Sequence, residues 1–160
     1  MMMPRPILCL LLLWGAVAPL HAQPAPAATP AAPAPAWDRI VIPPMPTSIY
    51  VGSVKLTTDP FVRSGMTLSS SYEAKVRPWF FWGETGTITM TMTDAALATL
   101  AKGERTEFTG EATNHKKKPR KVSGHADPTD ATSGKIKVKI MADGIELIFN
   151  GTYKLEKSEK

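Results

Sequence analysis

Hydrophobic and polar residues alternate most regularly near the end of the chain. From Lys135 to Ile140, lysine alternates with isoleucine or valine, and this period of two predicts a strand with one buried and one exposed face. Asp143-Gly144 follows and favours a type I′ turn, because both residues tolerate positive φ. The turn predicts a hairpin whose apolar residues share one face, with a well-defined register. The expected opposed pairs are Ile140–Leu147, Val138–Phe149 and Lys137–Asn150.

Similar alternation predicts the strands upstream. A strand over 47–58 would carry Tyr50, Val54 and Leu56 on one face, with Gly52 as a bulge or a close approach. The long alternation over 62–76 is expected to break near Ser69–Ser71 into two strands. Three further strands are expected: 87–93 with Ile88, Met90 and Met92 inward, 105–113 with Phe108, Gly110 and Ala112 on one face, and 120–126 with Val122, Gly124 and Ala126.

Residues 37–46 contain three prolines, which cannot donate to a strand ladder. We therefore expect this segment to be a lead-in that packs on the edge of the domain. Asp59-Pro60 indicates a turn.

One short helix is predicted over 95–102. Asp94 is the expected N-cap, and Gly103 the expected end. A helix of about two turns is marginal by itself. Leu97, Leu100 and Ala101 are therefore expected to dock on the sheet.

Together these elements make the domain mainly β. Seven or eight antiparallel strands in a meander, joined by hairpins and accompanied by one short helix, predict a small barrel or a sandwich. Closure into a barrel would remove the exposed strand edges. The pattern of residues leaves both architectures open.

The N-terminus has the organisation of an export signal. Arg5 precedes an apolar stretch from Ile7 to Leu20, and Ala22 ends a cleavage site of small residues. The apolar stretch is shorter than the roughly 20 residues that a membrane-spanning helix needs. Residues 1–22 are predicted to be a signal peptide, which places the protein in the periplasm or the extracellular space.

Composition divides the rest of the chain into two parts. Residues 23–36 are a Pro/Ala-rich linker that cannot bury a core, and residues 37–160 are the β-rich domain. Cys9, the single cysteine of the chain, lies in the predicted signal peptide. The exported part therefore has neither a disulfide nor a thiolate ligand.

Residues suited to catalysis are sparse. Apart from His21, the chain has His115 in a basic loop and His125 at an outward strand position, expected to face Thr109 beside Glu107 or Glu111. Neither has the spacing of a metal site. The chain also lacks paired carboxylates, a nucleophile elbow and a glycine-rich phosphate loop. We expect a protein that is not an enzyme and that has no catalytic residue, metal or cofactor.

The densest apolar feature is a run of four aromatic residues after Pro78. In a strand, four consecutive aromatic side chains point to both faces, so two of them leave the main core. These two either pack under the N-terminal lead-in or line a ligand cavity or a lipid-facing rim. The expected ligand-binding residues are Trp79, Phe80, Phe81, Trp82, Tyr72, Met90 and Met92.

A second candidate site is the basic run 116–121, between two expected strands. Residues 116–139 hold eight basic residues against Asp127 and Asp130, so one face should be positive. The run is either a solvated hairpin tip or a contact for lipid headgroups, acidic polysaccharide or nucleic acid, although no specific nucleic acid is expected. The expected anion-binding residues are Lys116, Lys117, Lys118, Arg120 and Lys121.

The segment Phe108-Thr-Gly-Glu-Ala-Thr-Asn-His115, with Pro119 and Val122 after it, resembles the YceI-like periplasmic polyisoprenoid-binding proteins. In that family a strand ends in a Thr-x-His turn followed by Lys-Pro-Val. The resemblance implies a lipocalin-like barrel that holds an isoprenoid chain.

Export, a β meander and aromatic residues in excess of a minimal core lead to one functional expectation. The protein is expected to be an exported binding module for an apolar or lipid-like ligand. The alternative is a structural or interaction domain of the cell envelope that docks on anionic surfaces through the basic hairpin. A solid core without a cavity would favour the alternative.

Overall fold

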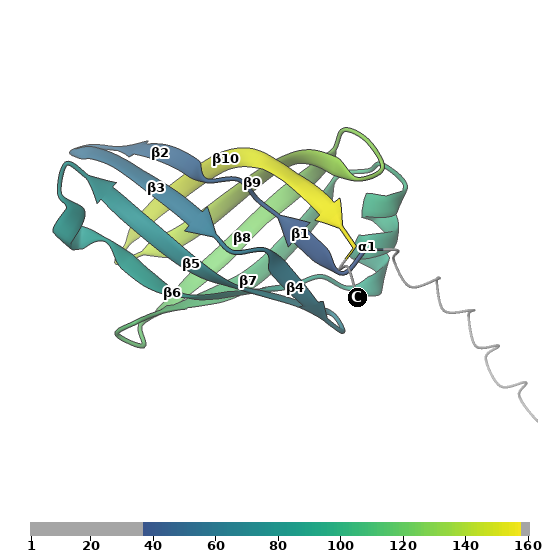
Figure 1. The fold of residues 1–160 in the computed structure, drawn as a ribbon, viewed down its shortest axis with the longest axis horizontal. Coiled ribbons are helices and arrows are strands. Elements are labelled where there is room, and N and C mark those ends of the chain that lie inside the picture. The colour runs from purple at the N-terminus through teal and green to yellow at the C-terminus, as the bar shows by residue number, and fades with distance from the viewer. Residues whose placement is uncertain (1–36, 158–160) are drawn as a thin grey trace, which may run out of the picture. The chain divides into compact units, whose positions relative to one another are not determined.

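The computed structural model describes residues 37–157. The predicted signal peptide (1–22) and linker (23–36) lie outside the described residues. The described chain forms ten antiparallel strands, a short 3₁₀ helix and one α-helix (Figure 1). The elements are β1 Arg39–Val41, β2 Met45–Ile49, β3 Gly52–Thr58, β4 Phe61–Ser64, β5 Thr67–Arg77, η1 Phe80–Trp82, β6 Glu84–Thr91, α1 Asp94–Ala101, β7 Thr106–Asn114, β8 Pro119–Pro128, β9 Ser133–Ala142 and β10 Ile145–Glu156.

The strands form a closed barrel, not a sandwich. Eight of them complete the ring, in the order β5-β4-β1-β10-β9-β8-β7-β6 and back to β5. The remaining two, β2 and β3, extend the sheet beside the other half of β5. The prediction of a small β-barrel with one short helix is confirmed, and the expected meander holds from β5 to β10.

Two positions around the barrel are each shared by two short strands. β4 pairs with residues 67–69 of β5, and β3 pairs with residues 72–77 of the same strand. Similarly, β1 pairs with residues 154–156 of β10. β2 lies beside β10, with the Met45 side chain against Gly151, but forms no ladder with it in the described part of the chain. We call this junction the β2–β10 seam.

The C-terminal hairpin has the predicted register. Ile140 is opposite Leu147, Val138 opposite Phe149, and Lys137 opposite Asn150. Asp143 and Gly144 have φ of 47° and 87°, the positive values that the expected turn requires. The inward sets of β6, β7 and β8 are also as predicted, because their large apolar members are buried.

Several expectations about the first half of the domain are wrong. The lead-in 37–46 contributes β1 and the start of β2, because its prolines lie between these strands or at a position that needs no donor. The stretch 47–58 turns at Tyr50 and Val51, so Tyr50 is exposed and not on an inward face. The long alternation breaks at Gly65-Met66, where Ser64 pairs with Thr67, and not at Ser69–Ser71.

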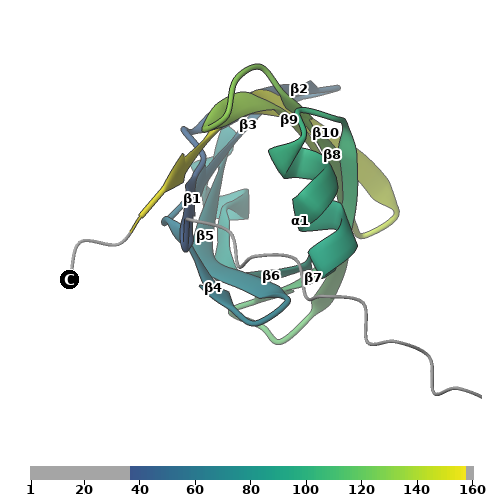
Figure 2. The same ribbon diagram turned by 90° about the vertical axis from the view of Figure 1, so that its right-hand side faces the viewer.

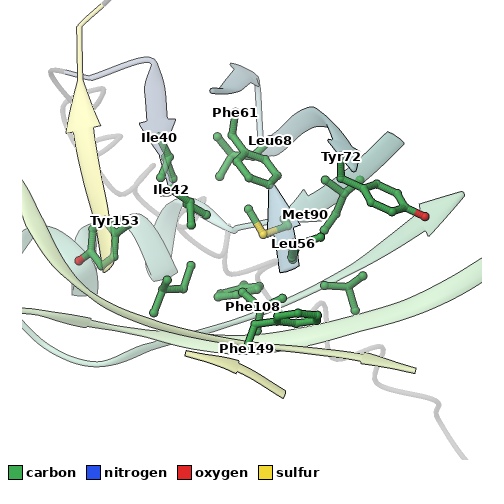
Figure 3. Packing of buried hydrophobic residues seen from close by; sticks show 14 of the residues in the cluster. Ile40, Ile42, Leu56, Phe61, Leu68, Tyr72, Met90, Phe108, Phe149 and Tyr153 are labelled. Atoms are coloured by element: carbon green, nitrogen blue, oxygen red, sulfur yellow. The ribbon is translucent and has the colours of Figure 1, made fainter. Parts of the chain in front are cut away.

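Side chains from all parts of the sheet fill the barrel interior. Phe61, Leu68 and Ile88 are almost fully buried, and Phe149 has no exposed surface. Figure 3 shows this packing, with Phe108 and Phe149 beneath Leu56 and Met90. The other labelled members of the cluster are Ile40, Ile42, Phe61, Leu68, Tyr72 and Tyr153. The described interior is a packed core.

Helix α1 covers one end of the barrel (Figure 2). Leu97 and Leu100 are buried as predicted, whereas Ala101 is exposed and does not dock. The N-cap is Thr93, whose hydroxyl accepts a hydrogen bond from the Ala96 amide at 3.2 Å, and not Asp94. Gly103 follows the helix with φ of 81°, consistent with its predicted role as the end of the helix.

Candidate functional site at the open end of the barrel

Four connections lie at the end of the barrel opposite α1, on the left in Figure 1. They are the β2–β3 turn (50–51), the β5–β6 connection containing η1 (78–83), the β7–β8 turn (115–118) and the β9–β10 turn (143–144). We call this end the open end and the opposite one the helix end. Strands alternate in direction around the barrel, so every second connection comes to the same end.

A cavity of about 670 Å³ lies at the open end. Its walls come from the β2–β3 turn, from β5, from η1 and from the β9–β10 hairpin, which lie on both sides of the β2–β10 seam. Most of the lining is apolar, and the charged lining residues are Glu84, Arg120, Asp143 and Glu146. The apolar lining residues are Ile49, Tyr50, Val51, Val54, Ala74, Val76, Trp82, Ala142, Ile145, Leu147 and Ile148.

Several inward-facing positions near the open end hold polar residues, although Ala74 and Val76 continue the inward set of β5 beyond them. Asn114 continues the inward set of β7, and Arg120 continues that of β8, because each lies an even number of residues from a buried apolar neighbour. Glu84 on β6 and Tyr72 on β5 also face inward. The barrel interior therefore changes from apolar side chains to a polar layer at this end.

These four side chains and Asp143 form one hydrogen-bond network. Arg120 donates from Nη1 to Asp143 Oδ1 at 2.8 Å and from Nη2 to Asp143 Oδ2 at 2.9 Å, and a third bond runs from Nη2 to Glu84 Oε2 at 3.2 Å. Tyr72 Oη donates to Glu84 Oε1, and Asn114 Nδ2 donates to Glu84 Oε2, both at 2.9 Å. Arg120 is only 7% exposed, whereas the Asp143 side chain is 66% exposed. The network therefore connects the interior with the surface.

The network shifts the pKa of each ionisable member. Burial, the hydrogen bond to Glu84 and its charge raise the pKa of Tyr72. Burial by itself would raise the pKa of Glu84, but hydrogen bonds from Asn114, Arg120 and Tyr72 hold it below its ordinary value. The hydrogen bonds from Arg120 lower the pKa of Asp143. Both carboxylates are therefore ionised at neutral pH, and they offset the buried guanidinium.

Asn114 also shapes the basic turn. Its Oδ1 accepts hydrogen bonds from the Lys116 and Lys118 amides at 3.0 and 2.9 Å, and the chain turns through Lys117 with φ of 59°. The Lys118 ammonium lies 3.9 Å from Asp143 Oδ1. One buried side chain thus contacts both the Arg120 network and the backbone of the lysine turn 116–118.

The aromatic run forms a cluster on the outside of the open end. It does not continue a strand, because residues 80–82 form a 3₁₀ turn after Pro78. The rings of Trp79, Phe81 and Trp82 have centroids 5.6–5.8 Å apart, and all three side chains are exposed. The side chain of Phe80 lies outside the described part of the structure.

The expected ligand-binding set is not gathered in one place. Tyr72, Met90 and Met92 are buried in the core, and the void next to the two methionines measures only about 10 Å³. Of the six members whose side chains are described, only Trp82 lines the open-end cavity. The described members of this set therefore do not surround one cavity, and their role in ligand binding stays a prediction.

The expected anion-binding set is also divided. Lys116, Lys117 and Lys118 are exposed at the tip, and Lys121 is exposed on the outer face of β8. Arg120 is not part of that surface, because it faces inward and is bonded to two carboxylates.

Sequence reasoning missed Glu84, Asn114 and Asp143 as site residues. The available signal was the alternation itself, because Arg120 and Asn114 share the inward parity of Val122 and Ala112.

The two histidines of the described residues take no part in this network. His115 is exposed in the basic turn, and its amide donates to the Thr85 carbonyl. His125 lies opposite Glu107, not Thr109 as expected, and its Nε2 is 3.5 Å from Asp127. Within residues 37–157, no three His, Cys, Asp or Glu side chains come together as a metal site. Helices in this range are too short or too polar to cross a membrane.

No family model matches the chain, and neither curated proteins nor solved structures give a match. The resemblance to polyisoprenoid-binding proteins stays a prediction.

Proposed function

We propose that this protein is an exported, non-enzymatic binding module that holds a small amphipathic molecule in the cavity at the open end of its barrel. The observation that carries the proposal is the cavity of about 670 Å³, a size within the range of about 300–1,000 Å³ that is usual for small-molecule sites. Such sites combine apolar walls with a few fixed polar groups. The open end offers both.

The walls suit an apolar body. Val54, Val76 and Leu147 line the cavity and are buried or half-buried, and Trp82 and Ile145 border it with exposed apolar surface. Covering such surface with a ligand would stabilise the complex by about 25 cal/mol per Å² of apolar area removed from water.

The polar layer suits a hydrogen-bonding end group. Arg120 lines the cavity, and its Nε is buried without a hydrogen-bond partner among the described residues. Buried donors are normally satisfied, so an acceptor oxygen on a ligand, or a water molecule that bridges to it, would complete the site. Since the charges of Arg120, Glu84 and Asp143 already offset one another, a neutral carbonyl or hydroxyl group fits better than a strongly charged one.

The packed interior favours a second candidate, a structural or interaction domain of the cell envelope. Below the polar layer the described barrel has no room for a long chain, since its small void measures about 10 Å³. An interaction domain would leave the open-end cavity empty, so ligand binding separates the two functions.

Titration of the purified protein with a hydrophobic fluorophore, together with native mass spectrometry for co-purified lipid, tests the proposal. We expect saturable binding by the parent and by Ala131→Trp, which adds the same ring in the exposed loop after β8. Ala74→Trp should fill the cavity and weaken binding at least tenfold. Ile145→Asp should also weaken binding at least tenfold. It replaces an exposed residue at the rim of the cavity, so it does not overpack the core. No bound mass and no saturable site in the parent would contradict the proposal.

A further inference from the structure

Exposed apolar side chains are concentrated at the open end. Of the ten large apolar residues that are exposed in the described chain, six lie in the connections at this end or directly beside them. They come from three separate connections, and the helix end has only Met66 in its turns. The six are Tyr50, Val51, Trp79, Phe81, Trp82 and Ile145. Soluble proteins seldom gather such surface unless it binds a partner or a membrane.

The charge around this end is positive. The segments 50–53, 77–84, 114–120 and 142–146 hold five basic and three acidic residues. Two of the three acidic residues, Glu84 and Asp143, are bonded to Arg120. The three lysines of the 116–118 tip are therefore offset only in part, by the 3.9 Å contact between Lys118 and Asp143. The segments at the helix end, 37–39, 62–66, 92–106, 127–133 and 155–157, hold six acidic and five basic residues.

From this combination we infer that the open end of the barrel docks on a bilayer that contains anionic lipids. Tryptophan and tyrosine favour the interface between headgroups and acyl chains, where their rings are covered and their polar atoms stay wet. Lysines near such a surface are attracted to anionic headgroups, and their long stems let the ammonium groups reach the headgroup level. The inference stands on the exposed surface and does not require the ligand proposed above.

The chemistry of the apolar side chains favours a bilayer over an acidic polysaccharide. Sugars stack on flat aromatic rings, but they do not form a comparable stacking contact with aliphatic side chains. Val51 and Ile145 are 54% and 63% exposed. Val51 lies in the β2–β3 turn, Ile145 directly follows the β9–β10 turn, and both line the cavity. Acyl chains would cover the aromatic and aliphatic side chains together.

The orientation of the barrel agrees with docking at this end. Trp37 and Lys157, the first and last described residues, lie at the helix end, where the Asp38 amide donates to the Glu156 carbonyl (Figure 1). Both ends of the described chain therefore lie away from the proposed membrane face. If the cavity binds a ligand, as proposed above, its mouth would face the bilayer.

Co-sedimentation with vesicles tests the inference. The purified protein is mixed with vesicles of phosphatidylcholine alone or with about one third phosphatidylglycerol, at low salt and at a salt concentration where the Debye length falls below ~8 Å. We expect binding to the anionic vesicles, a loss at high salt, and a blue shift of tryptophan emission with quenching by brominated acyl chains.

Two variants and their matched controls separate the contributions. Replacing Lys116, Lys117 and Lys118 by Gln should weaken binding about fivefold per lysine at low salt, on the order of 100-fold together. The control replaces Lys102, Lys135 and Lys154, exposed residues near the helix end, and should bind like the parent. Replacing Trp79, Phe81 and Trp82 by Ser should reduce binding at both salt concentrations, whereas replacing Val62 and Met66 by Ser should not.

Equal losses in the tip variant and its control would overturn the inference, as would binding to an acidic polysaccharide without binding to vesicles. A melting temperature for each variant identifies failures of folding. Docking is measured without fluorophore, and Ala74→Trp should dock like the parent. Failure of docking and failure of ligand binding are therefore distinguishable.

Discussion

Arg120 and Asp143 are joined by two parallel hydrogen bonds of 2.8 and 2.9 Å, which tie the turn of the β9–β10 hairpin to a buried side chain of β8. A guanidinium matches a carboxylate in this two-pronged geometry, which a lysine cannot reproduce. Since the Asp143 φ is positive, the same residue forms the turn and holds the buried cation. One pair of residues therefore holds the β9–β10 turn against β8.

Arg120→Met should destabilise the protein. The substitution leaves the half-buried Glu84 carboxylate without its cation, and loss of one partner of a fully buried pair costs about 3–5 kcal/mol. Because Asp143 is 66% exposed and Glu84 keeps its bonds from Tyr72 and Asn114, we expect about 2 kcal/mol. Urea unfolding measures the change. Lys121→Met, on the outer face, should change the unfolding free energy by less than about 0.5 kcal/mol.

Acid should weaken the same network. The pKa of Glu84 is lower in the folded protein than in the unfolded chain, so its contribution is fully present above the unfolded value of about 4.3. That contribution is lost as the pH falls through the lower folded pKa. The difference in unfolding free energy between the parent and Glu84→Gln should therefore be largest at pH 7 and shrink below about pH 4. A constant difference from pH 7 to pH 3 would contradict this assignment, and Glu111→Gln, at an exposed position on β7, is the control.

Local alternation was sufficient to predict the second half of the fold. The hairpin of β9 and β10 has its predicted register, because one short turn and a strict period of two leave a single arrangement with lysines outside. Alternation failed in the first half, where short strands follow one another along a longer partner. No local feature of the sequence distinguishes one continuous strand over 47–58 from two strands joined by a turn at Tyr50 and Val51.

The candidate site was harder to predict, because its residues come together only when the barrel closes. Glu84 and Arg120 are 36 positions apart in the chain, and neither belongs to a motif. Arg120 was assigned to the surface because of its lysine neighbours, although its parity with Val122 places it inside. The aromatic run was expected in a strand, but after Pro78 it forms a 3₁₀ turn at the rim.

Gly124→Ala should destabilise the barrel through its core. An added Cβ at this position would meet the Phe108 ring and the Lys137 carbonyl. Overpacking of this kind typically costs about 1–3 kcal/mol, and we expect a lower midpoint of urea unfolding with an unchanged slope. Ser123→Ala, the exposed neighbour on β8, should be nearly neutral. Equal unfolding free energies for Gly124→Ala and Ser123→Ala would contradict the close contact between position 124 and the Phe108 ring.

The docked helix should contribute strongly to stability. Leu97 and Leu100 are 5% and 6% exposed, and truncation of a buried leucine to alanine costs about 2–5 kcal/mol. Leu100→Ala should therefore lower the melting temperature clearly, and Thr93→Ala, which removes the N-cap, should cost about 1 kcal/mol. Ala101→Ser, at an exposed position of the same helix, is the control and should be nearly neutral.

The β2–β10 seam has a consequence for the width of the barrel. In a closed barrel the number of strands and their stagger fix the diameter, and at the helix end β1 completes that ring. At the open end β2 lies beside β10 without a ladder, so the circumference there can grow or shrink without breaking a backbone hydrogen bond. The strand ladder therefore fixes the bore where the helix covers it but not where the cavity opens, and the binding module proposed above could accommodate molecules of different girth.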